Sequence, residues 1–207
     1  MIQRLAAIAL LPLLTGCPGI HVREPVGEPV DTGIADFPEY SQWIVAEGFE
    51  EEFVVTVKRV GPGRFEFRAF GEWDDLGSPV AAGGGEARFA RLPGGLEIVS
   101  FREGDEETWN VLAVDRESAA STKGKLVPVS PKLVAWIDAG TDGTRTLTSE
   151  SGATGVFKTD SWDLVTWEGD PDHLAEWLAD NADLAFERAD GFPVRLLGAG
   201  LPSFDYR

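Results

Sequence analysis

Side chains that commonly carry out chemistry are sparse in this chain. Its two histidines are His21 and His173, and the sequence contains no Gly-x-Ser-x-Gly, Ser-x-x-Lys, His-Glu-x-x-His or Gly-x-x-x-x-Gly-Lys pattern. So few histidines disfavour a Ser–His triad and a multi-histidine zinc site. We expect both histidines to be solvated. We therefore assign no catalytic, metal-binding or cofactor-binding residue and expect a protein that is not an enzyme.

One segment partly matches a calcium-binding loop. Asp138, Asp142 and Gly143 fit positions one, five and six of such a loop. Position three is Gly140, which has no side-chain ligand, and position twelve is Ser149, where a bidentate glutamate is needed. A turn made of aspartate and glycine explains the segment better, and calcium binding by Asp138 and Asp142 stays open.

Carboxylates and tryptophans offer two weaker signals. The 35 acidic residues could include a catalytic pair, but such a pair is defined by a separation of roughly 5–10 Å in space. Five tryptophans could line a pocket or stack on sugars, although tryptophan in a strand usually packs in a core. These are Trp73, Trp109, Trp136, Trp162 and Trp167.

The amino terminus has the composition of a secretory signal. Arg4 precedes an apolar stretch from Leu5 to Leu14, and small residues follow it. An apolar stretch of about ten residues is too short to span a bilayer roughly 30 Å thick. We therefore expect residues 1–16 to be a cleaved signal peptide rather than a transmembrane helix.

The segment Leu14-Thr15-Gly16-Cys17 resembles the lipobox of bacterial lipoproteins. The resemblance covers only residues 1–17. It implies cleavage before Cys17, a diacylglycerol on its sulfur and acylation of the new amino terminus. Two or three acyl chains anchor a protein durably, because each buried methylene contributes about 0.8 kcal/mol. The alternative is an ordinary signal peptide with a chance cysteine.

Lipidation at Cys17 predicts the localisation and the first partner. We expect a protein of the bacterial cell envelope, held by acylated Cys17 in the outer membrane and facing the periplasm. Cys17 is the single cysteine, so no disulfide forms within the chain.

The chain is strongly acidic, with a formal net charge of −17. Removal of residues 1–16, which carry one arginine and no acid, makes it more negative by one. Such a surface repels nucleic acid and anionic lipid. We interpret the charge as a means of solubility, with an acidic binding face as the alternative.

Residues 17–40 have the composition of a tether. They contain Pro18, Pro25, Pro29 and Pro38 together with glycines and acids. Proline restricts φ, so the segment should be extended and solvated, with a reach of tens of ångströms. Residues 41–207 then form a single, mainly β domain of ordinary size.

The clearest structural pattern is a hairpin. Residues 52–60 and 64–69 alternate apolar and polar side chains on either side of Gly61-Pro62-Gly63. A glycine-rich loop is expected at 81–85. Further strands are expected at 86–91, 96–102, 108–114, 125–129, 132–138, 162–167 and 192–197.

One late helix is expected at 171–181. Asp170 suits the N-cap and Pro171 the first helical position. Leu174, Trp177 and Leu178 have the spacing of one buried stripe. We expect Trp177 to be a core anchor and His173, one turn earlier, to lie on the surface.

These patterns predict a mainly β fold: an antiparallel meander forming a barrel or strongly bent sheet, with one late α-helix packed on it. The leading functional hypothesis is a non-enzymatic, lipid-anchored binding or assembly module with an envelope protein partner. One alternative is a carrier of a small apolar ligand. The plan is loosely similar to that of lipocalins, although Gln42-Trp43 lacks the glycine of their Gly-x-Trp signature. The other alternative is a carboxylate-dependent hydrolase.

Overall fold

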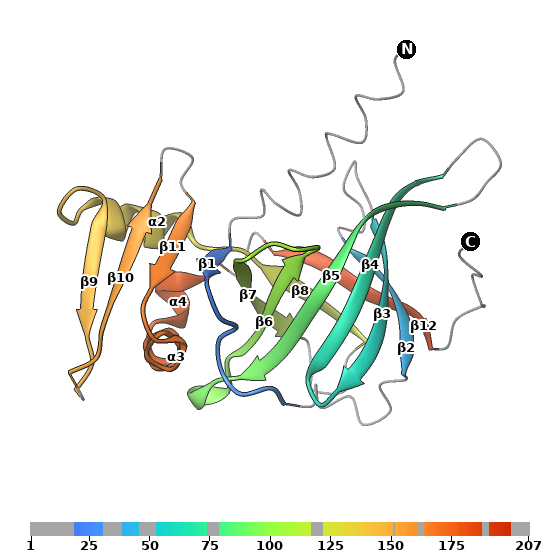
Figure 1. The fold of residues 1–207 in the computed structure, drawn as a ribbon, viewed down its shortest axis with the longest axis horizontal. Coiled ribbons are helices and arrows are strands. Elements are labelled where there is room, and N and C mark those ends of the chain that lie inside the picture. Colours follow the sequence, from blue (N-terminus) through green and yellow to red (C-terminus); the bar gives the residue numbers. More distant parts are fainter. Residues whose placement is uncertain are drawn as a thin grey trace, which may run out of the picture.

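The computed structural model describes residues 19–30, 39–45, 53–73, 79–116, 122–150, 152–160, 164–187 and 191–199. Eight strands form a closed antiparallel barrel (Figure 1). They are β2 (Tyr40–Val45), β3 (Phe53–Gly61), β4 (Arg64–Trp73), β5 (Pro79–Arg91), β6 (Glu97–Glu103), β7 (Trp109–Arg116), β8 (Lys123–Val127) and β12 (Phe192–Ala199).

The barrel is an up-and-down meander. Each strand from β2 to β8 pairs with the next, and β12 closes the barrel by pairing with both β8 and β2. Val194 of β12 lies opposite Val45 of β2. The predicted mainly β, antiparallel barrel is confirmed.

The predicted hairpin is confirmed as β3 and β4, with Val57 opposite Phe67. Paired residues point to the same face and successive residues to opposite faces, so these two side chains face the interior. Lys58 and Glu66 face outward, where they form an exposed ion pair of 3.7 Å. Gly63 in the turn has a φ of 58°, which glycine adopts without strain.

The expected loop at residues 81–85 is wrong, because these residues lie inside β5. Gly85 lies opposite Glu103 of β6. A Cβ at Gly85 would approach the carbonyl oxygen of Arg102 to 1.9 Å. The glycine therefore allows a close approach of β5 and β6 rather than ending the strand.

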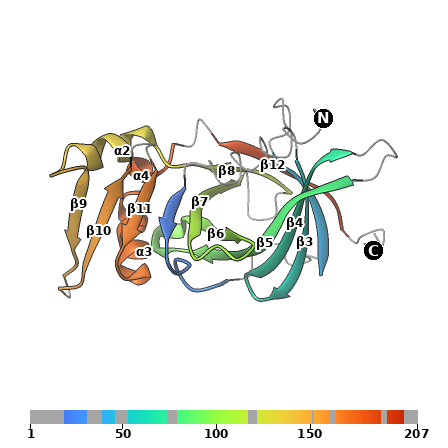
Figure 2. The same cartoon turned by 45° about the horizontal axis from the view of Figure 1, so that its top comes forward.

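A second sheet branches from the barrel at β7. Its strands lie in the order β1 (Ile20–Val22), β11 (Val165–Glu168), β10 (Thr154–Thr159) and β9 (Thr144–Thr148). β1 pairs with the first half of β7, whereas β8 pairs with the second half of the same edge. β1 also pairs with β11 in parallel. Figures 1 and 2 show this sheet standing beside the barrel.

Residues 19–30 belong to the folded structure, so the predicted solvated tether is wrong for this stretch. Three of its four aliphatic side chains are 0–3% exposed: Ile20, Val22 and Val26. After β1 the chain crosses the outer wall of the barrel. There the Val26 N–H donates to Ser100 Oγ (3.2 Å), and the Val30 N–H donates to the carbonyl of Phe89 (3.0 Å). Residues 31–38 lie outside the described residues.

An insertion between β8 and β12 holds α2 (Pro131–Asp138), α3 (Pro171–Asp180) and α4 (Ala182–Ala185). The expected strand at 132–138 is wrong, because this segment is α2. Ser130 caps it by accepting from the Lys132 N–H (3.1 Å), and Leu133 and Ile137 are buried one turn apart. Within the described part of the chain, no helix is both long and apolar enough to cross a bilayer.

The late helix is confirmed as α3, and Asp170 caps it by accepting from the Asp172 N–H (2.9 Å). The expected surface position of His173 is wrong, whereas Trp177 packs against the core as expected, with its ring centroid 4.8 Å from that of Phe157. His173 is buried, with its ring edge-on to Trp167 at 5.5 Å, whereas Trp177 is only half-buried. His173 is buried because Trp167 covers the face of α3 on which it lies, in addition to the core that covers the Leu174 face.

The larger hydrophobic core lies outside the barrel. It fills the space between the outer wall of the barrel, the second sheet and the helices. The ring of Phe157 packs on those of Trp167 and Trp177, with distances between ring centroids of 4.7 and 4.8 Å. A Cβ at Gly155 would lie 2.1 Å from the Trp167 ring, so glycine there makes room for the indole.

Because β1 is part of this core, truncating Ile20 should destabilise the fold. Ile20→Ala is expected to lower the free energy of unfolding by about 2–5 kcal/mol. The exposed Glu24→Ala, four residues along the chain, is the control and should change it by less than about 0.5 kcal/mol. Urea unfolding followed by tryptophan fluorescence measures both. Equal midpoints for Ile20→Ala and the unmodified protein would contradict the docking of β1.

Candidate binding site in the barrel interior

Apolar side chains line much of the barrel interior, and some of them are buried whereas others are only half-buried. On β4, β6 and β7 the inward-facing side chains of Phe67, Val99, Phe101 and Leu112 are buried. On β2, β3, β8 and β12 the inward-facing apolar side chains are only half-buried. We name five of these the apolar wall: Trp43, Val55, Val57, Leu126 and Phe192.

The apolar wall differs from the core on the other side of the barrel strands. Core side chains such as Ile98, Val111 and Leu133 are 0% exposed. Four members of the apolar wall pack against the buried cluster of Phe67, Val99, Phe101 and Leu112 and still keep part of their surface exposed. These four are Val55, Val57, Leu126 and Phe192. The apolar wall is therefore the candidate surface for an apolar ligand.

Polar groups are few along the apolar wall. Ser41 faces the interior from β2 and is fully buried. Its Oγ accepts a hydrogen bond of 2.9 Å from Nε1 of Trp43. This bond satisfies the indole N–H and fixes the orientation of the ring on the wall.

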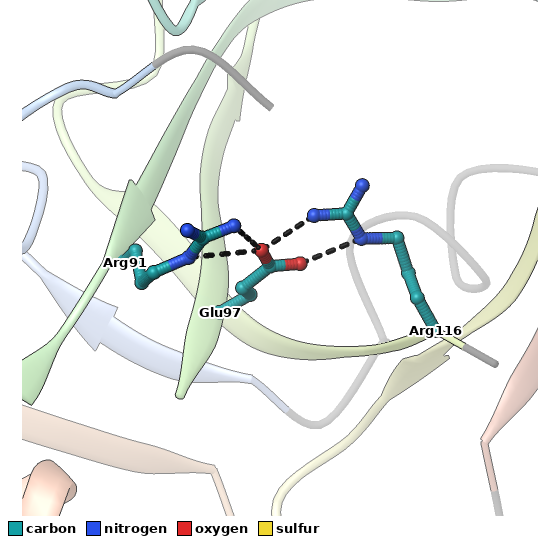
Figure 3. A network of polar contacts seen from close by, with 3 residues as sticks. All are labelled: Arg91, Glu97 and Arg116. Carbon is teal, nitrogen blue, oxygen red and sulfur yellow. Dashed lines mark hydrogen bonds and ion pairs between the residues drawn. The ribbon is translucent and has the colours of Figure 1, made fainter. Parts of the chain in front are cut away.

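Three charged residues form a cluster at one end of the inward-facing rows. Arg91 is the last residue of β5, Glu97 the first of β6 and Arg116 the last of β7 (Figure 3). Arg116 donates from Nε and Nη2 to the two oxygens of Glu97 at 2.6 and 2.5 Å. Arg91 donates from Nε (3.1 Å) and Nη2 (2.5 Å) to Glu97 Oε1. One carboxylate thus binds two guanidinium groups, which leaves the cluster with a net charge of +1.

Burial within this arginine–glutamate cluster is uneven. The side chains of Arg116 and Glu97 are 9% and 13% exposed, whereas that of Arg91 is 46% exposed. An ion pair is worth little in water, but losing one partner of a buried pair leaves an uncompensated charge.

The two ends of the cluster should therefore respond differently to mutation. Glu97→Ala is expected to lower the free energy of unfolding by about 3 kcal/mol, because Arg116 loses its bidentate partner in a buried setting. Arg91→Ala should cost only about 0–1 kcal/mol, because its pair is half-exposed. Urea unfolding of both variants tests this order. Equal losses of unfolding free energy for the two variants would mean that Arg116 and Glu97 are exposed to water rather than buried.

A second polar group lies at the opposite end of β6. Glu103 is six residues after Glu97 on the same inward face, which places it roughly 20 Å away at about 3.3 Å per residue. Asn110 of β7 is opposite Phe101 on one side and His21 of β1 on the other. Glu103, Asn110 and His21 therefore share one face, and we name them the polar row.

Within the part of the chain that the structure describes, each member of the polar row has a buried atom without a hydrogen-bond partner. These atoms are Glu103 Oε1, Asn110 Oδ1 and His21 Nε2. The carboxyl of Glu103 lies close to Gly83 of β5, where a Cβ would come within 3.4 Å of Oε1. A buried polar atom without a partner costs about 1–3 kcal/mol, so three neighbouring ones mark a site rather than a structural necessity.

Electrostatics disfavour charge on two members of the polar row. Burial raises the pKa of Glu103, and the nearby charge of Glu106 raises it further. Burial lowers the pKa of His21, while Asp160 acts in the opposite direction. Both pKa shifts disfavour the charged forms of the Glu103 carboxyl and the His21 imidazole.

The structure distributes the candidate residues from the sequence widely. His21, expected to be solvated, is half-buried in the polar row, and His173 packs in the core. Glu97 and Glu103, with their separation of roughly 20 Å, exceed the 5–10 Å spacing of a glycosidase pair. Cys17 lies outside the described residues.

Residues 138–143 form a turn between α2 and β9. Thr159 Oγ1 donates to Asp138 Oδ1 at 2.5 Å, and Asp142 and Gly143 both have positive φ. A Cβ at Gly140 would lie 1.9 Å from the carbonyl oxygen of Thr144, which explains glycine there. Among the described residues, no three His, Cys, Asp or Glu side chains are grouped so as to hold a metal ion.

The tryptophans singled out from the sequence do not form a pocket together. Trp109 and Trp167 are buried in the core, and Trp136 is half-buried beneath the guanidinium of Arg145 at 5.0 Å. The side chain of Trp73 and all of Trp162 lie outside the described residues. Among the tryptophans whose side chains the structure describes, Trp43 faces the barrel interior.

The sequence analysis missed Trp43, the arginine–glutamate cluster and the polar row. A signal existed for β6, because alternation places Glu97 and Glu103 on the same face as Val99 and Phe101. Charged residues at both ends of an apolar face are unusual for a strand whose inner face does nothing but pack in a hydrophobic core. No comparable signal linked His21 to Asn110, because their pairing joins distant parts of the chain.

The fold and site together define a closed, eight-stranded, up-and-down barrel with an apolar interior and polar groups at both ends of β6. No family model, characterised protein or solved structure matched this chain in the comparisons made.

Proposed function

We propose that this chain is a non-enzymatic, lipid-anchored protein of the bacterial envelope whose barrel binds a small, largely apolar ligand. The observation that carries the proposal is the apolar wall, whose inward-facing side chains remain partly uncovered. Covering apolar surface is favourable by roughly 25 cal/mol per Å². An apolar molecule in the interior would supply that cover.

The same observation favours a ligand carrier over an assembly module. Side chains that point into a closed barrel are out of reach of the flat surface of a protein partner. A small molecule that enters through one end can reach them, as in other small barrels that hold one ligand.

The anchor completes the proposal. Cys17 is three residues before Ile20, which is fully buried in β1. Three residues span at most about 11 Å. A lipid on Cys17 would therefore hold the barrel close to the surface of the outer membrane, on its periplasmic side. The membrane is also the largest reservoir of apolar ligands.

Binding in the interior is tested by filling it. The protein should bind the fluorescent apolar probe N-phenyl-1-naphthylamine saturably. Val57→Trp adds an indole to the apolar wall and should weaken this binding at least about tenfold. Val60→Trp is the matched control on the same strand, because Val60 is 47% exposed, and it should bind like the unmodified protein.

Unfolding midpoints of both variants show whether each is folded, and Val55→Phe provides a milder inward change should Val57→Trp be destabilised. The carrier proposal is wrong if the unmodified protein shows no saturable binding. It is also wrong if folded inward variants and Val60→Trp bind the probe equally.

Anchoring is tested at the cysteine. Cys17→Ala should abolish incorporation of labelled palmitate during bacterial expression, because the thioether attachment needs the sulfur. The variant should also be either uncleaved or released from membranes by a carbonate wash. A cleaved Cys17→Ala protein that stays on washed membranes would refute the lipid anchor.

A further inference from the structure

We propose that the polar row of Glu103, Asn110 and His21 binds the head group of an amphipathic amine, with the ligand's alkyl chain lying along the apolar wall. This inference rests on the proposed carrier function and adds the chemical class of the ligand to it.

The first argument is placement. Asn110 and His21 are directly paired across strands, and such pairs have Cβ atoms about 4.5–5.5 Å apart on one face. Glu103 is two residues after Phe101, which is opposite Asn110, so it is a diagonal neighbour of Asn110 at roughly 7 Å. The Glu103 carboxyl lies against Gly83 of β5, so it would have to rotate toward Asn110 for one head group to reach all three side chains.

The second argument is the kind of atom left without a partner. Glu103 Oε1 and Asn110 Oδ1 are acceptors. His21 Nε2 is also an acceptor when the neutral imidazole carries its proton on Nδ1. A primary ammonium group has three N–H donors and no acceptor. It would satisfy three acceptors at once, which a carboxylate head group would not.

The third argument is charge. Burial holds the pKa of Glu103 above its usual range and that of His21 below it. An ammonium would compensate the Glu103 carboxylate, and it would find the imidazole uncharged. An anionic head group would meet the carboxylate of Glu103 instead and be repelled.

The unpartnered atoms are shielded from solvent in the unliganded protein. Side-chain rotation is common when a ligand binds. Turning toward an ammonium would give each atom the hydrogen bond that it lacks, so the penalty present in the free protein would become part of the binding energy.

The arginine–glutamate cluster favours the same orientation of a cationic ligand. It carries a net charge of +1 at the other end of β6. A cationic head group is repelled from that end and attracted to the polar row. The ligand would therefore enter in one orientation, with its alkyl chain between the two ends.

The test uses three probes with the same alkyl chain: dodecylamine, 1-dodecanol and dodecanoate, below their aggregation limits at pH 7. Each competes with N-phenyl-1-naphthylamine for the full-length mature protein. Dodecylamine should displace the probe at a concentration at least about tenfold lower than dodecanoate does, since a charge-assisted hydrogen bond contributes that much.

Glu103→Gln should reduce the preference for dodecylamine over dodecanoate about tenfold. It should leave the binding of 1-dodecanol unchanged. Glu107→Gln is the matched control. It makes the same change of charge in the exposed turn after β6, and it should keep the preference. Asn110→Leu, which keeps the size but loses the acceptor, should weaken dodecylamine binding as well. Unfolding midpoints confirm that each variant is folded.

The two proposals fail in different ways. If neither N-phenyl-1-naphthylamine nor any of the three alkyl compounds binds, the carrier function is wrong. If the compounds bind but dodecanoate is as strong as dodecylamine, the amine site is wrong and the carrier stands. The amine site is also wrong if Glu103→Gln and Glu107→Gln keep the same preference for dodecylamine over dodecanoate.

Discussion

The architecture depends on the shared edge of β7. One edge of this strand pairs with β1 along Trp109–Val111 and with β8 along Ala113–Arg116. A strand edge offers one row of backbone donors and acceptors, and here two strands divide that row end to end. β8 continues the barrel, and β1 begins the second sheet. The barrel and the second sheet are therefore joined through backbone hydrogen bonds.

This division decides where the core lies. Because the second sheet and its helices cover the outer wall of the barrel, side chains such as Ile98 and Val111 are fully buried on that side. Most of the stabilising burial is thus placed outside the barrel. The interior does not have to be filled to stabilise the fold, and the half-buried apolar wall follows from this arrangement. In the proposed carrier, this half-buried apolar wall provides the surface that a ligand contacts.

The same edge also builds the polar row. His21 reaches Asn110 only because β1 is docked beside β7. In the proposed anchored protein, the residues that follow the lipid would form part of the ligand site. Stability of the amino-terminal strand and ligand binding would then be linked, because a ligand that binds only the docked form stabilises it.

Local sequence patterns determined several elements by themselves. The alternation of β3 and β4 around Gly63 and the cap at Asp170 are nearest-neighbour effects, and both elements formed as expected. The Ser130 cap and the spacing of Leu133 and Ile137 also indicate a helix, whereas the short apolar run by itself predicts a strand. A run of this length fits either element when its caps are overlooked.

Tertiary structure alone decided the rest. Ile20 is buried because β7 and β11, far along the chain, flank it, and no property of a proline-rich segment encodes those neighbours. A helical wheel identifies the Leu174 stripe, but it does not reveal that Trp167 covers His173. The polar row likewise joins three strands. Alternation tells which face a side chain takes, whereas only strand pairing decides which other side chains share it, because that choice depends on contacts distant in sequence.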